Sequence, residues 1–354
     1  MPDFKDKTIV ITGGTGSLGK VLIRRLLKKE NDPPKKIIVF SRDEAKQHQM
    51  RIEYQRKIKA TDEVIYHNFE RLIEFRIGDI RNYHSVSAVL KNADIVINAA
   101  ALKQVPSCEY FPFEAVQTNI IGAENIVRVI REEGLPVETV VGVSTDKACK
   151  PVNTMGMTKA IQERIFTVAN IYAPATRFIC VRYGNVLASR GSVIPLFHEQ
   201  IRHGGPVTVT TPEMTRFLLP LERAVDTILV ALKEAKRGEI YVPVIPSARI
   251  TDLAGVLIGN RDIELKITGI RPGEKVHEML VSEEEAWRTY NRGQYYAIQP
   301  MLPEVAAPEE HEQPLGKAYS SGDSLMSIPE INELLTEHHL LAGDENNEIE
   351  ELLR

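Results

Sequence analysis

Short apolar runs alternate with longer amphipathic stretches over the first half of the chain. Each short run is rich in Val and Ile, which predicts a buried strand. Between them, apolar residues recur three and four positions apart, which predicts helices packed on a sheet. This alternation indicates an α/β fold with a doubly wound parallel sheet. The predicted strands are a first run after Lys7, then Lys36–Phe40, Glu74–Ile77, Asp94–Asn98, Thr139–Val143 and Phe178–Arg182; the predicted helices are Lys20–Lys29, Glu114–Arg131 and Asn153–Ile171.

The pattern changes after Asn185, where short apolar segments are separated by turns rich in Gly and Pro. We expect a second, smaller α/β lobe built from insertions. The expected division is a sheet domain of residues 1–185 completed by about 217–245, a smaller lobe of 186–216 and 246–300, and a C-terminal part of 301–354.

Two further segments differ from the alternating pattern. Ala45–Leu72 is charged and helix-forming, and it is longer than a strand–helix crossover requires, so we interpret it as an inserted helical excursion. At the other end, a loop over Met301–Gly316, a short helix over Ile328–Leu341 and a frayed acidic tail over 343–354 are expected.

The first strand runs directly into a glycine-rich turn, TGGTGSLG, with Gly13, Gly16 and Gly19 at three-residue spacing. Between a strand and a helix, such glycines permit a tight turn, close approach of a pyrophosphate and helix packing on the strand. A purely structural turn is the alternative. We favour a dinucleotide site of the Rossmann type, formed by Gly13, Thr15, Gly16, Ser17, Leu18 and Gly19.

Residues at later strand ends indicate which dinucleotide binds. An NAD site would place a carboxylate after the second strand, but this chain has Ser41 and Arg42, with Lys46 nearby. These cations favour a 2′-phosphate and hence NADP, although Asp43 could still bias the site toward NAD. Further cofactor contacts are expected at Asp79, Ile80, Ala99, Ala100, Ala101, Lys159, Tyr183 and Asn185.

The stretch STDKACKPVNTMGMTK, residues 144–159, follows the fifth strand. A fold of the short-chain dehydrogenase type has a Ser or Thr, a Tyr and a Lys here; Thr145 and Lys159 are present, but position 155 is Met. Either the chain is inactive, or acid–base chemistry has moved to the adjacent Asp146 and Lys147. The alternative for that pair is two loop charges.

Asn119 lies in the middle of the helix predicted before the fifth strand. Two interpretations of this residue are open. A buried Asn would hold the backbone of the active site, whereas a surface Asn would read the same in the sequence.

Composition narrows the class of protein. The formal charge of −4 on 354 residues creates no field that would attract nucleic acid or an anionic membrane. The three cysteines are too widely spaced for a metal or disulfide framework, so we expect them to be reduced and buried, with no metal site. We find no leader and no apolar run of membrane-spanning length, so a cytoplasmic protein without membrane insertion is expected.

Several long motifs together resemble one known family. They are TGGTGSLG, FSRDE, GDIRN, AAALKQVPSCE, STDKACKPVNTMGMTK, RYGNVLASRGSVIPLF, MTRFLLPLERAVD and RPGEKVHEML, spanning roughly residues 4–285. With them the chain resembles extended short-chain dehydrogenases of the nucleotide-sugar 4,6-dehydratase group, and within it the UDP-N-acetylglucosamine 4,6-dehydratases of polysaccharide and flagellin-glycan synthesis. The capsule-synthesis branch is similar in having Met at the position of Met155.

The resemblance implies a redox-neutral lyase reaction with tightly bound NADP. Hydride leaves sugar C4, water is lost across C5 and C6, and hydride returns at C6. Asp146 would be the acid for the C6 hydroxyl, Lys147 the base at C5, Thr145 a partner of the C4 oxygen, and Lys159 a ligand of the nicotinamide ribose. A Lys base must be neutral, and desolvation by cofactor and sugar is expected to lower its pKa.

The resemblance also implies a UDP-sugar partner for the smaller, substrate-binding lobe and a homo-oligomer. The implied substrate contacts are Lys103, Asn185, Arg190, Thr215, Arg216, Arg271 and Glu274. Inversion at C5 is favoured. The alternatives are a C5-retaining dehydratase, a 4-epimerase or reductase, and a non-catalytic NADP-binding sensor or scaffold. The acceptor of the C4 hydroxyl proton stays open, since Met155 cannot take a proton.

Overall fold

The structure is a computed structural model that describes residues 4–28, 33–56, 69–187, 192–306 and 313–342. Arg190, residues 57–68 of the predicted excursion, residues 307–312 of the predicted loop and the predicted acidic tail lie outside the described residues.

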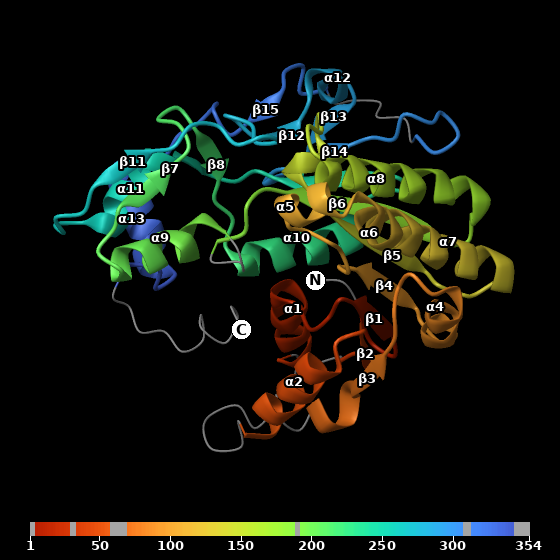
Figure 1. Cartoon of the computed structure of the whole chain (residues 1–354). Coiled ribbons are helices and arrows are strands. Elements are labelled where there is room, and N and C mark those ends of the chain that lie inside the picture. The colour runs from red at the N-terminus through yellow and green to blue at the C-terminus, as the bar shows by residue number, and fades with distance from the viewer. Residues whose placement is uncertain (1–3, 29–32, 57–68, 188–191, 307–312, 343–354) are drawn as a thin grey trace.

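A nine-stranded sheet within the described residues organises the molecule, in the order β13-β14-β9-β6-β5-β4-β1-β2-β3 (Figure 1). From β3 to β9 every neighbouring pair is parallel, as predicted. The strands are β1 Thr8–Thr12, β2 Lys36–Ser41, β3 Ile73–Ile77, β4 Ile95–Asn98, β5 Thr139–Thr145, β6 Arg177–Tyr183, β9 Ile240–Pro243, β13 Thr289–Asn291 and β14 Tyr295–Ile298.

Helices flank this sheet in two groups, which makes it doubly wound. One group has α1 Ser17–Leu27 packed on α10 Leu221–Glu234. In the other group, α7 Gly122–Glu133 packs on α4 Tyr83–Leu90 on one side and on α8 Thr154–Tyr172 on the other. Ile9, Ile11 and Val181 are fully buried, so the parallel strands form the core between the two groups.

The helix predicted over residues 114–131 is composite. It follows α5 Val105–Tyr110 and consists of α6 Pro112–Ala115, the π-helix η2 Val116–Ile121 and then α7. The predicted excursion begins with a helix, α2 Glu44–Arg56.

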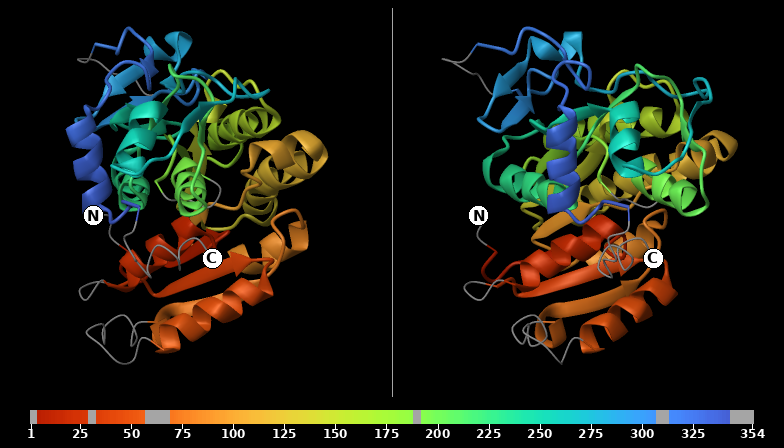
Figure 2. Two further views of the ribbon diagram at one scale, coloured as in Figure 1. Left: turned by 60° about the vertical axis from the view of Figure 1, so that its left-hand side comes forward. Right: turned by 90° about the vertical axis from the view of Figure 1, so that its left-hand side faces the viewer.

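The smaller lobe has its own apolar core, which includes Phe197, Leu253 and Ile331. Figure 2 shows it beside the sheet domain. Its elements are α9 Val193–Arg202, β7 Val207–Val209, β8 Thr215–Phe217, β10 Ser247–Arg249, α11 Ile250–Ile258, β11 Leu265–Ile267 and α13 Ile328–Glu337; β12 Met279–Val281, α12 Glu283–Ala286 and β15 Tyr319–Ser320 lie nearby.

Two expectations about the C-terminal third need correction. Residues 289–298 were assigned to the smaller lobe, but β13 and β14 form a hairpin that extends the main sheet antiparallel to β9. This pairing satisfies the backbone of an otherwise open edge. The helix α13 was assigned to a separate C-terminal part, but Ile331 and Leu335 pack in the core of the smaller lobe.

The three cysteines are free and buried, as predicted. Among the residues that the structure describes, no helix combines the length and the apolar character needed to cross a bilayer.

Candidate active site

A cavity of about 1370 Å³ lies at the carboxyl ends of the parallel strands, between the sheet domain and the smaller lobe. Its wall includes every residue predicted to bind the cofactor. Those residues are Gly13, Thr15, Gly16, Ser17, Leu18, Gly19, Ser41, Arg42, Lys46, Asp79, Ile80, Ala99, Ala100, Ala101, Lys159, Tyr183 and Asn185.

The glycine turn fits a pyrophosphate. Helix α1 begins at Ser17 after Gly16, and no side chain caps this helix end. Gly13 has a φ of +65°, and a Cβ there would lie 2.8 Å from the backbone of Ala100. A Cβ on Gly19 would lie 2.4 Å from the carbonyl oxygen of Gly14. The turn is therefore packed against the backbone of neighbouring segments, and the amino end of a helix faces the cavity, as anion binding requires.

Basic side chains gather at the rim beside β2, next to the glycine turn. Arg42 lies 3.9 Å from Asp79, and Lys46 lies 3.3 Å from Asp43. Arg81, which we did not predict, binds Asp79 through Nε at 2.9 Å and Nη2 at 2.7 Å. The Arg42 side chain is 55% exposed and the Lys46 side chain 44%, so both remain accessible to a ligand phosphate.

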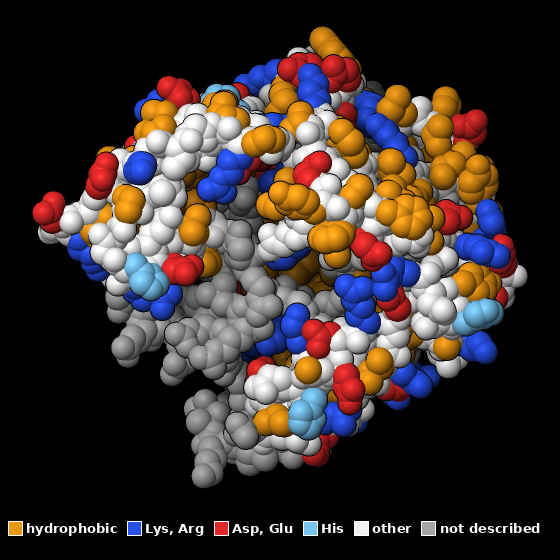
Figure 3. Space-filling view, in the orientation of Figure 1, with side chains coloured by type: hydrophobic (Ala, Val, Ile, Leu, Met, Phe, Trp, Pro, Cys, Tyr) orange, Lys and Arg blue, Asp and Glu red, His pale blue; other side chains and the backbone are white. Residues whose placement is uncertain are grey.

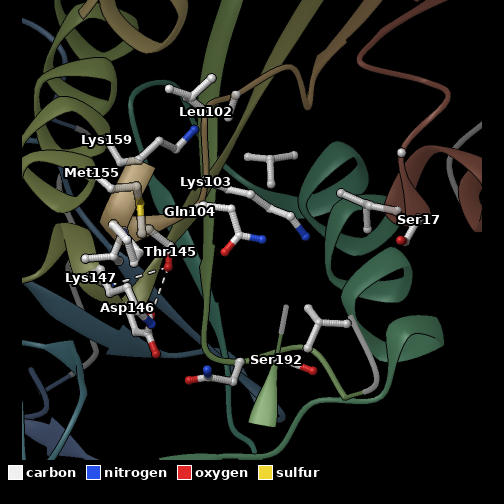
Figure 4. A pocket seen from close by; sticks show the side chains of 18 of the residues that line it. Ser17, Leu102, Lys103, Gln104, Thr145, Asp146, Lys147, Met155, Lys159 and Ser192 are labelled. Carbon is white, nitrogen blue, oxygen red and sulfur yellow. Dashed lines mark hydrogen bonds and ion pairs between the residues drawn. The ribbon is translucent and has the colours of Figure 1, made fainter. Parts of the chain in front are cut away.

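The predicted acid–base pair lies where β5 ends in a short 3-10 helix, η3 Asp146–Ala148 (Figure 4). The Thr145 hydroxyl donates a hydrogen bond to Asp146 Oδ1 at 2.8 Å. Lys147 Nζ donates to the same oxygen at 3.0 Å. Asp146 is fully buried, and its Oδ2 has no hydrogen-bond partner among the described residues. A buried carboxylate oxygen without a partner is costly, which indicates that a ligand or water completes this site.

Lys147 carries a positive charge in this structure, whereas a lysine that acts as a base must be neutral. Its Nζ also lies 3.5 Å from Glu278 Oε1. Burial opposes the charged form, but the carboxylates of Asp146 and Glu278 outweigh that effect and raise the pKa of Lys147 above its ordinary value. In the protein alone, Lys147 is an ammonium ion, so the expected lowering of its pKa does not occur at this stage.

Met155 and Lys159 lie on one face of α8 and both line the cavity (Figure 4). Met155 is 4% exposed and belongs to a small apolar cluster with Cys108 and Ala115. Lys159 Nζ donates to Gln162 Oε1 at 2.6 Å, and burial lowers the pKa of Lys159 to about 8. The position of the usual Tyr is thus filled by an inert apolar side chain, and the Lys is held in place beside it.

Asn119 is fully buried, so the structure supports the interpretation in which it holds the backbone of the site, and not the one in which it lies at the surface. In the π-helical turn η2, its side chain accepts from Leu102 N at 2.8 Å and donates to Leu102 O at 3.0 Å and Thr158 Oγ1 at 2.9 Å. It therefore fixes the segment that carries Lys103 along the cavity wall (Figure 4).

The predicted substrate contacts are largely brought together. The cavity wall includes Lys103, Asn185, Arg216, Arg271 and Glu274. The Asn185 Oδ1 is buried and has no hydrogen-bond partner among the described residues.

Thr215 does not fit the role predicted for it and needs correction. It is 1% exposed and does not line the cavity. Its hydroxyl binds His277 Nδ1 at 2.9 Å and Ser321 Oγ at 2.7 Å. Neighbouring residues on a strand point to opposite faces, so Arg216 reaches the cavity and Thr215 cannot.

Glu278 is the main site residue that the sequence did not reveal. It lines the cavity, is 3% exposed, and has an Oε2 without a hydrogen-bond partner among the described residues. Besides Lys147, Arg216 Nε lies 3.8 Å from its Oε1. The available signal was a Glu next to the apolar run MLV in RPGEKVHEMLV, a setting in which a charged side chain needs a partner.

A buried network of ion pairs around Arg182 connects the strand that carries the site to neighbouring elements. Arg182 is 1% exposed and lies between Glu163, 2.7 Å from Nη2, and Glu285, 2.7 Å from Nη1. Glu163 also accepts from the Ser144 hydroxyl at 2.6 Å. This network ties β5, β6 and α8 to α12, and it reaches β5 at Ser144, two residues before Asp146.

Several known proteins are similar to this chain over most of its length. An uncharacterized membrane protein of Methanocaldococcus jannaschii is 44% identical over 308 residues, which cover 84% of this chain and 87% of the relative. A UDP-glucose 4-epimerase of Rickettsia typhi is 41% identical over 346 residues, covering 94% and 96%. The X-ray structure of Pen from Bacillus thuringiensis matches with a TM-score of 0.84 and 35% identity, and covers 96% of this chain and 99% of that chain.

A family model described as polysaccharide biosynthesis protein matches residues 9–300, which include the glycine turn, the acid–base pair and Glu278. Together with the parallel sheet and the cavity at its carboxyl edge, this match shows that the chain belongs to the polysaccharide biosynthesis protein family.

Proposed function

We propose that the protein is a nucleotide-sugar 4,6-dehydratase that converts UDP-N-acetylglucosamine to a UDP-4-keto-6-deoxy sugar, with NADP as its resident cofactor. The observation that carries the proposal is the pairing of Asp146 with Lys147 in the cavity, 3.0 Å apart, at the end of β5. Loss of water across C5 and C6 needs an acid and a base close together, and this pair supplies both kinds of group.

The residues take the following roles. NADP would supply the acceptor for hydride from sugar C4 and the donor of hydride to C6. Thr145 hydrogen-bonds the C4 oxygen, Asp146 gives a proton to the leaving C6 hydroxyl, and Lys147 removes the C5 proton. Lys159 binds the nicotinamide ribose. The diphosphate and uridine lie along the wall formed by Lys103, Asn185, Arg216, Arg271 and Glu274. Arg190, outside the described residues, is a further candidate on the sequence resemblance alone.

The charge state of the pair is compatible with these roles after one proton transfer. As an ion pair, Asp146 is a carboxylate and Lys147 an ammonium. Moving one proton across their hydrogen bond produces a carboxylic acid and a neutral amine, the acid and the base that elimination requires. When the sugar excludes water, an ion pair loses solvation and the neutral pair gains relative to it.

The cofactor choice rests on the rim beside β2. Arg42 and Lys46 are accessible there, and Ser41 stands where an NAD site would have a carboxylate. The Ser41 hydroxyl lies 3.0 Å from that of Thr15. This arrangement favours a 2′-phosphate over a 2′-hydroxyl.

A 4-epimerase is the second candidate, favoured by the name of the rickettsial relative. An epimerase of this fold moves a proton and a hydride only at C4, so it needs the base that Met155 has replaced. It has no use for an acid–base pair at C5 and C6. The side chains in the cavity therefore support the dehydratase over the epimerase.

We also propose a homo-oligomer. Large apolar side chains are exposed on one face, over α5, α6 and α8 (Figure 3). Tyr110 is 84% exposed, and Phe111, Phe113, Ile161 and Tyr172 are also exposed. An exposed apolar patch of this kind is typical of a contact between protein subunits.

The test is incubation of the purified protein with UDP-N-acetylglucosamine and no added cofactor. The dehydratase gives a product lighter by one water molecule, and proton NMR of that product shows whether C5 is inverted, the outcome we favour, or retained. An epimerase would give UDP-N-acetylgalactosamine of unchanged mass, and a non-catalytic sensor would leave the sugar nucleotide intact.

A further inference from the structure

The Asp146–Lys147 pair cannot store the proton of the C4 hydroxyl and still act as the acid and the base of the elimination. Elimination requires Asp146 protonated and Lys147 neutral, a state in which the pair holds one proton. The ion pair in the structure, a carboxylate with an ammonium, also holds one. The proton that leaves the C4 hydroxyl therefore needs a third group. This inference rests on the proposed function.

Glu278 is placed to be that group. It comes from the segment before β12, far from the pair in sequence, and its carboxylate is almost fully buried at 3% exposure. Its Oε1 faces Lys147 Nζ at 3.5 Å, while its Oε2 has no hydrogen-bond partner among the described residues. A carboxylate oxygen at this distance from an ammonium nitrogen can take a proton from it, and both groups are then neutral.

A continuous chain of polar atoms joins the sugar end of the site to Glu278. Thr145 Oγ1 lies 2.8 Å from Asp146 Oδ1, which lies 3.0 Å from Lys147 Nζ. Lys147 Nζ lies 3.5 Å from Glu278 Oε1. Each group along this chain can donate or accept a proton. When a proton passes from Thr145 to Asp146, Lys147 can therefore pass one to Glu278.

We propose that Glu278 stores the proton of the C4 hydroxyl during each turnover by accepting a proton from Lys147. As C4 is oxidised, its hydroxyl proton passes through Thr145 to Asp146, and Lys147 gives a proton to Glu278. Asp146 is then an acid, Lys147 a neutral amine and Glu278 a neutral acid. This is the state that elimination needs.

The remaining steps return every proton. Lys147 takes the C5 proton while Asp146 protonates the C6 hydroxyl, which leaves as water. After C6 is reduced, Lys147 returns a proton to C5, on the opposite face of the sugar where C5 is inverted and on the same face where it is retained. Glu278 then gives its stored proton back to Lys147, which restores the ion pair with Asp146. Protons and electrons balance without any further reactant.

Other charged groups near these side chains do not serve as well. Asp146, Glu278 and Arg216 face Lys147, and Lys147 and Arg216 face Glu278. Arg216 keeps its proton at any ordinary pH. The ring of the adjacent His277 is bound to Thr215, away from the cavity wall.

The test is the pH profile of Glu278→Gln. In Glu278→Gln, Lys147 has no carboxylate at position 278 to which it can give its proton. Only protein molecules whose Lys147 is already neutral can then start the reaction. Dehydration should fall by about 10²–10³-fold near neutral pH and then recover roughly tenfold per pH unit toward alkaline pH, while the wild type stays nearly flat. Glu278→Asp, which keeps a carboxylate, should recover part of the neutral rate. The matched control is Glu283→Gln on α12, whose carboxylate pairs with Lys150 at the surface.

Two measurements separate this role from a structural one. Thermal unfolding with and without UDP checks that Glu278→Gln is folded and binds nucleotide. In unliganded protein, the Lys147 side-chain NMR signal, assigned by its absence in Lys147→Arg, should titrate at lower pH in Glu278→Gln than in wild type. A pH-independent loss of activity, an unchanged rate, or an unchanged Lys147 titration would overturn the proposal. If wild-type protein itself forms no dehydrated product, the proposed function fails instead.

Discussion

The ammonium nitrogen of Lys147 lies 3.0 Å from Oδ1 of Asp146, its neighbour in the chain. The two side chains come from one short turn at the end of β5, so their contact does not depend on the smaller lobe. What depends on a distant segment is Glu278, which brings a second carboxylate to the same nitrogen. The proposed acid–base pair is thus local in sequence, whereas the proposed proton store comes from a distant segment.

Lys147→Arg should abolish dehydration without removing the cation from the site. Arginine keeps a positive charge for Asp146 and Glu278, but it does not lose its proton and cannot act as a base. The rate of UDP-N-acetylglucosamine dehydration, followed by NMR, should fall by about 10²–10⁴-fold. Lys150→Arg, three residues later at the surface, is the control and should stay active. Substantial activity in Lys147→Arg would exclude Lys147 as the base.

Glu285→Gln should destabilise the fold in a pH-dependent way. Despite burial, which opposes the charged form, Arg182 lowers the pKa of Glu285 from its ordinary 4.5 to about 2. The carboxylate therefore contributes stability above about pH 4.5 that is lost as the pH falls toward about 2. At neutral pH the variant should lose about 3–5 kcal/mol of unfolding free energy, because Arg182 keeps only Glu163 as a carboxylate partner.

Denaturant unfolding of both proteins over that acid range measures the effect. The gap in unfolding free energy between wild type and variant should narrow as the pH falls. Glu333→Gln, an exposed carboxylate on α13, is the control and should show no comparable gap. A gap that is constant with pH would mean that Glu285 acts through packing and not through its charge.

Gly13→Ala should empty the cofactor site. The added Cβ would meet the backbone of Ala100 at 2.8 Å, and the φ of +65° adds strain of about 1–3 kcal/mol. Gly134→Ala is a matched control, because Gly134 has a φ of +61° but nothing within 4 Å of the added Cβ. The cofactor released on denaturation should be absent from the first variant and present in the second. Equal cofactor in both would contradict the assignment of the glycine turn.

Arg42→Ala should shift the cofactor preference from NADP toward NAD. A charge-assisted hydrogen bond to a 2′-phosphate is worth about 1.5–3 kcal/mol, so the ratio of the two dissociation constants should change by roughly 10–100-fold. Calorimetric titration of protein stripped of cofactor measures both constants. Arg128→Ala, on the surface of α7, should leave the ratio unchanged, and a wild type that binds NAD more tightly would refute the NADP assignment.

The sheet and the glycine turn could be predicted from the sequence because their signals are local. A buried strand, a glycine turn and a helix start within a few residues of one another, and parallel strands deliver their ends to one edge. The same reasoning placed Thr145, Asp146 and Lys147 together. Local patterns could not show that Glu278 meets Lys147, because that contact is made by two distant segments of the chain.

Other features depended on choices that local patterns leave open. Thr215 and Arg216 are adjacent, and only the register of β8 decides which of them faces the cavity. The hairpin of β13 and β14 turns at Gly293, which was a visible turn signal, but the strand that it pairs with is set by tertiary structure. Local patterns likewise do not show that Asn119, in its π-helical turn, hydrogen-bonds the backbone of Leu102.

The most direct measurement of the central claim uses UDP-N-acetylglucosamine deuterated at C4. A 4,6-dehydratase moves the label within the molecule, so NMR of the product should show deuterium in the C6 methyl group and a ketone at C4. If the deuterium stays at C4 while the sugar becomes its C4 epimer, or if the label does not move at all, the dehydratase assignment is wrong.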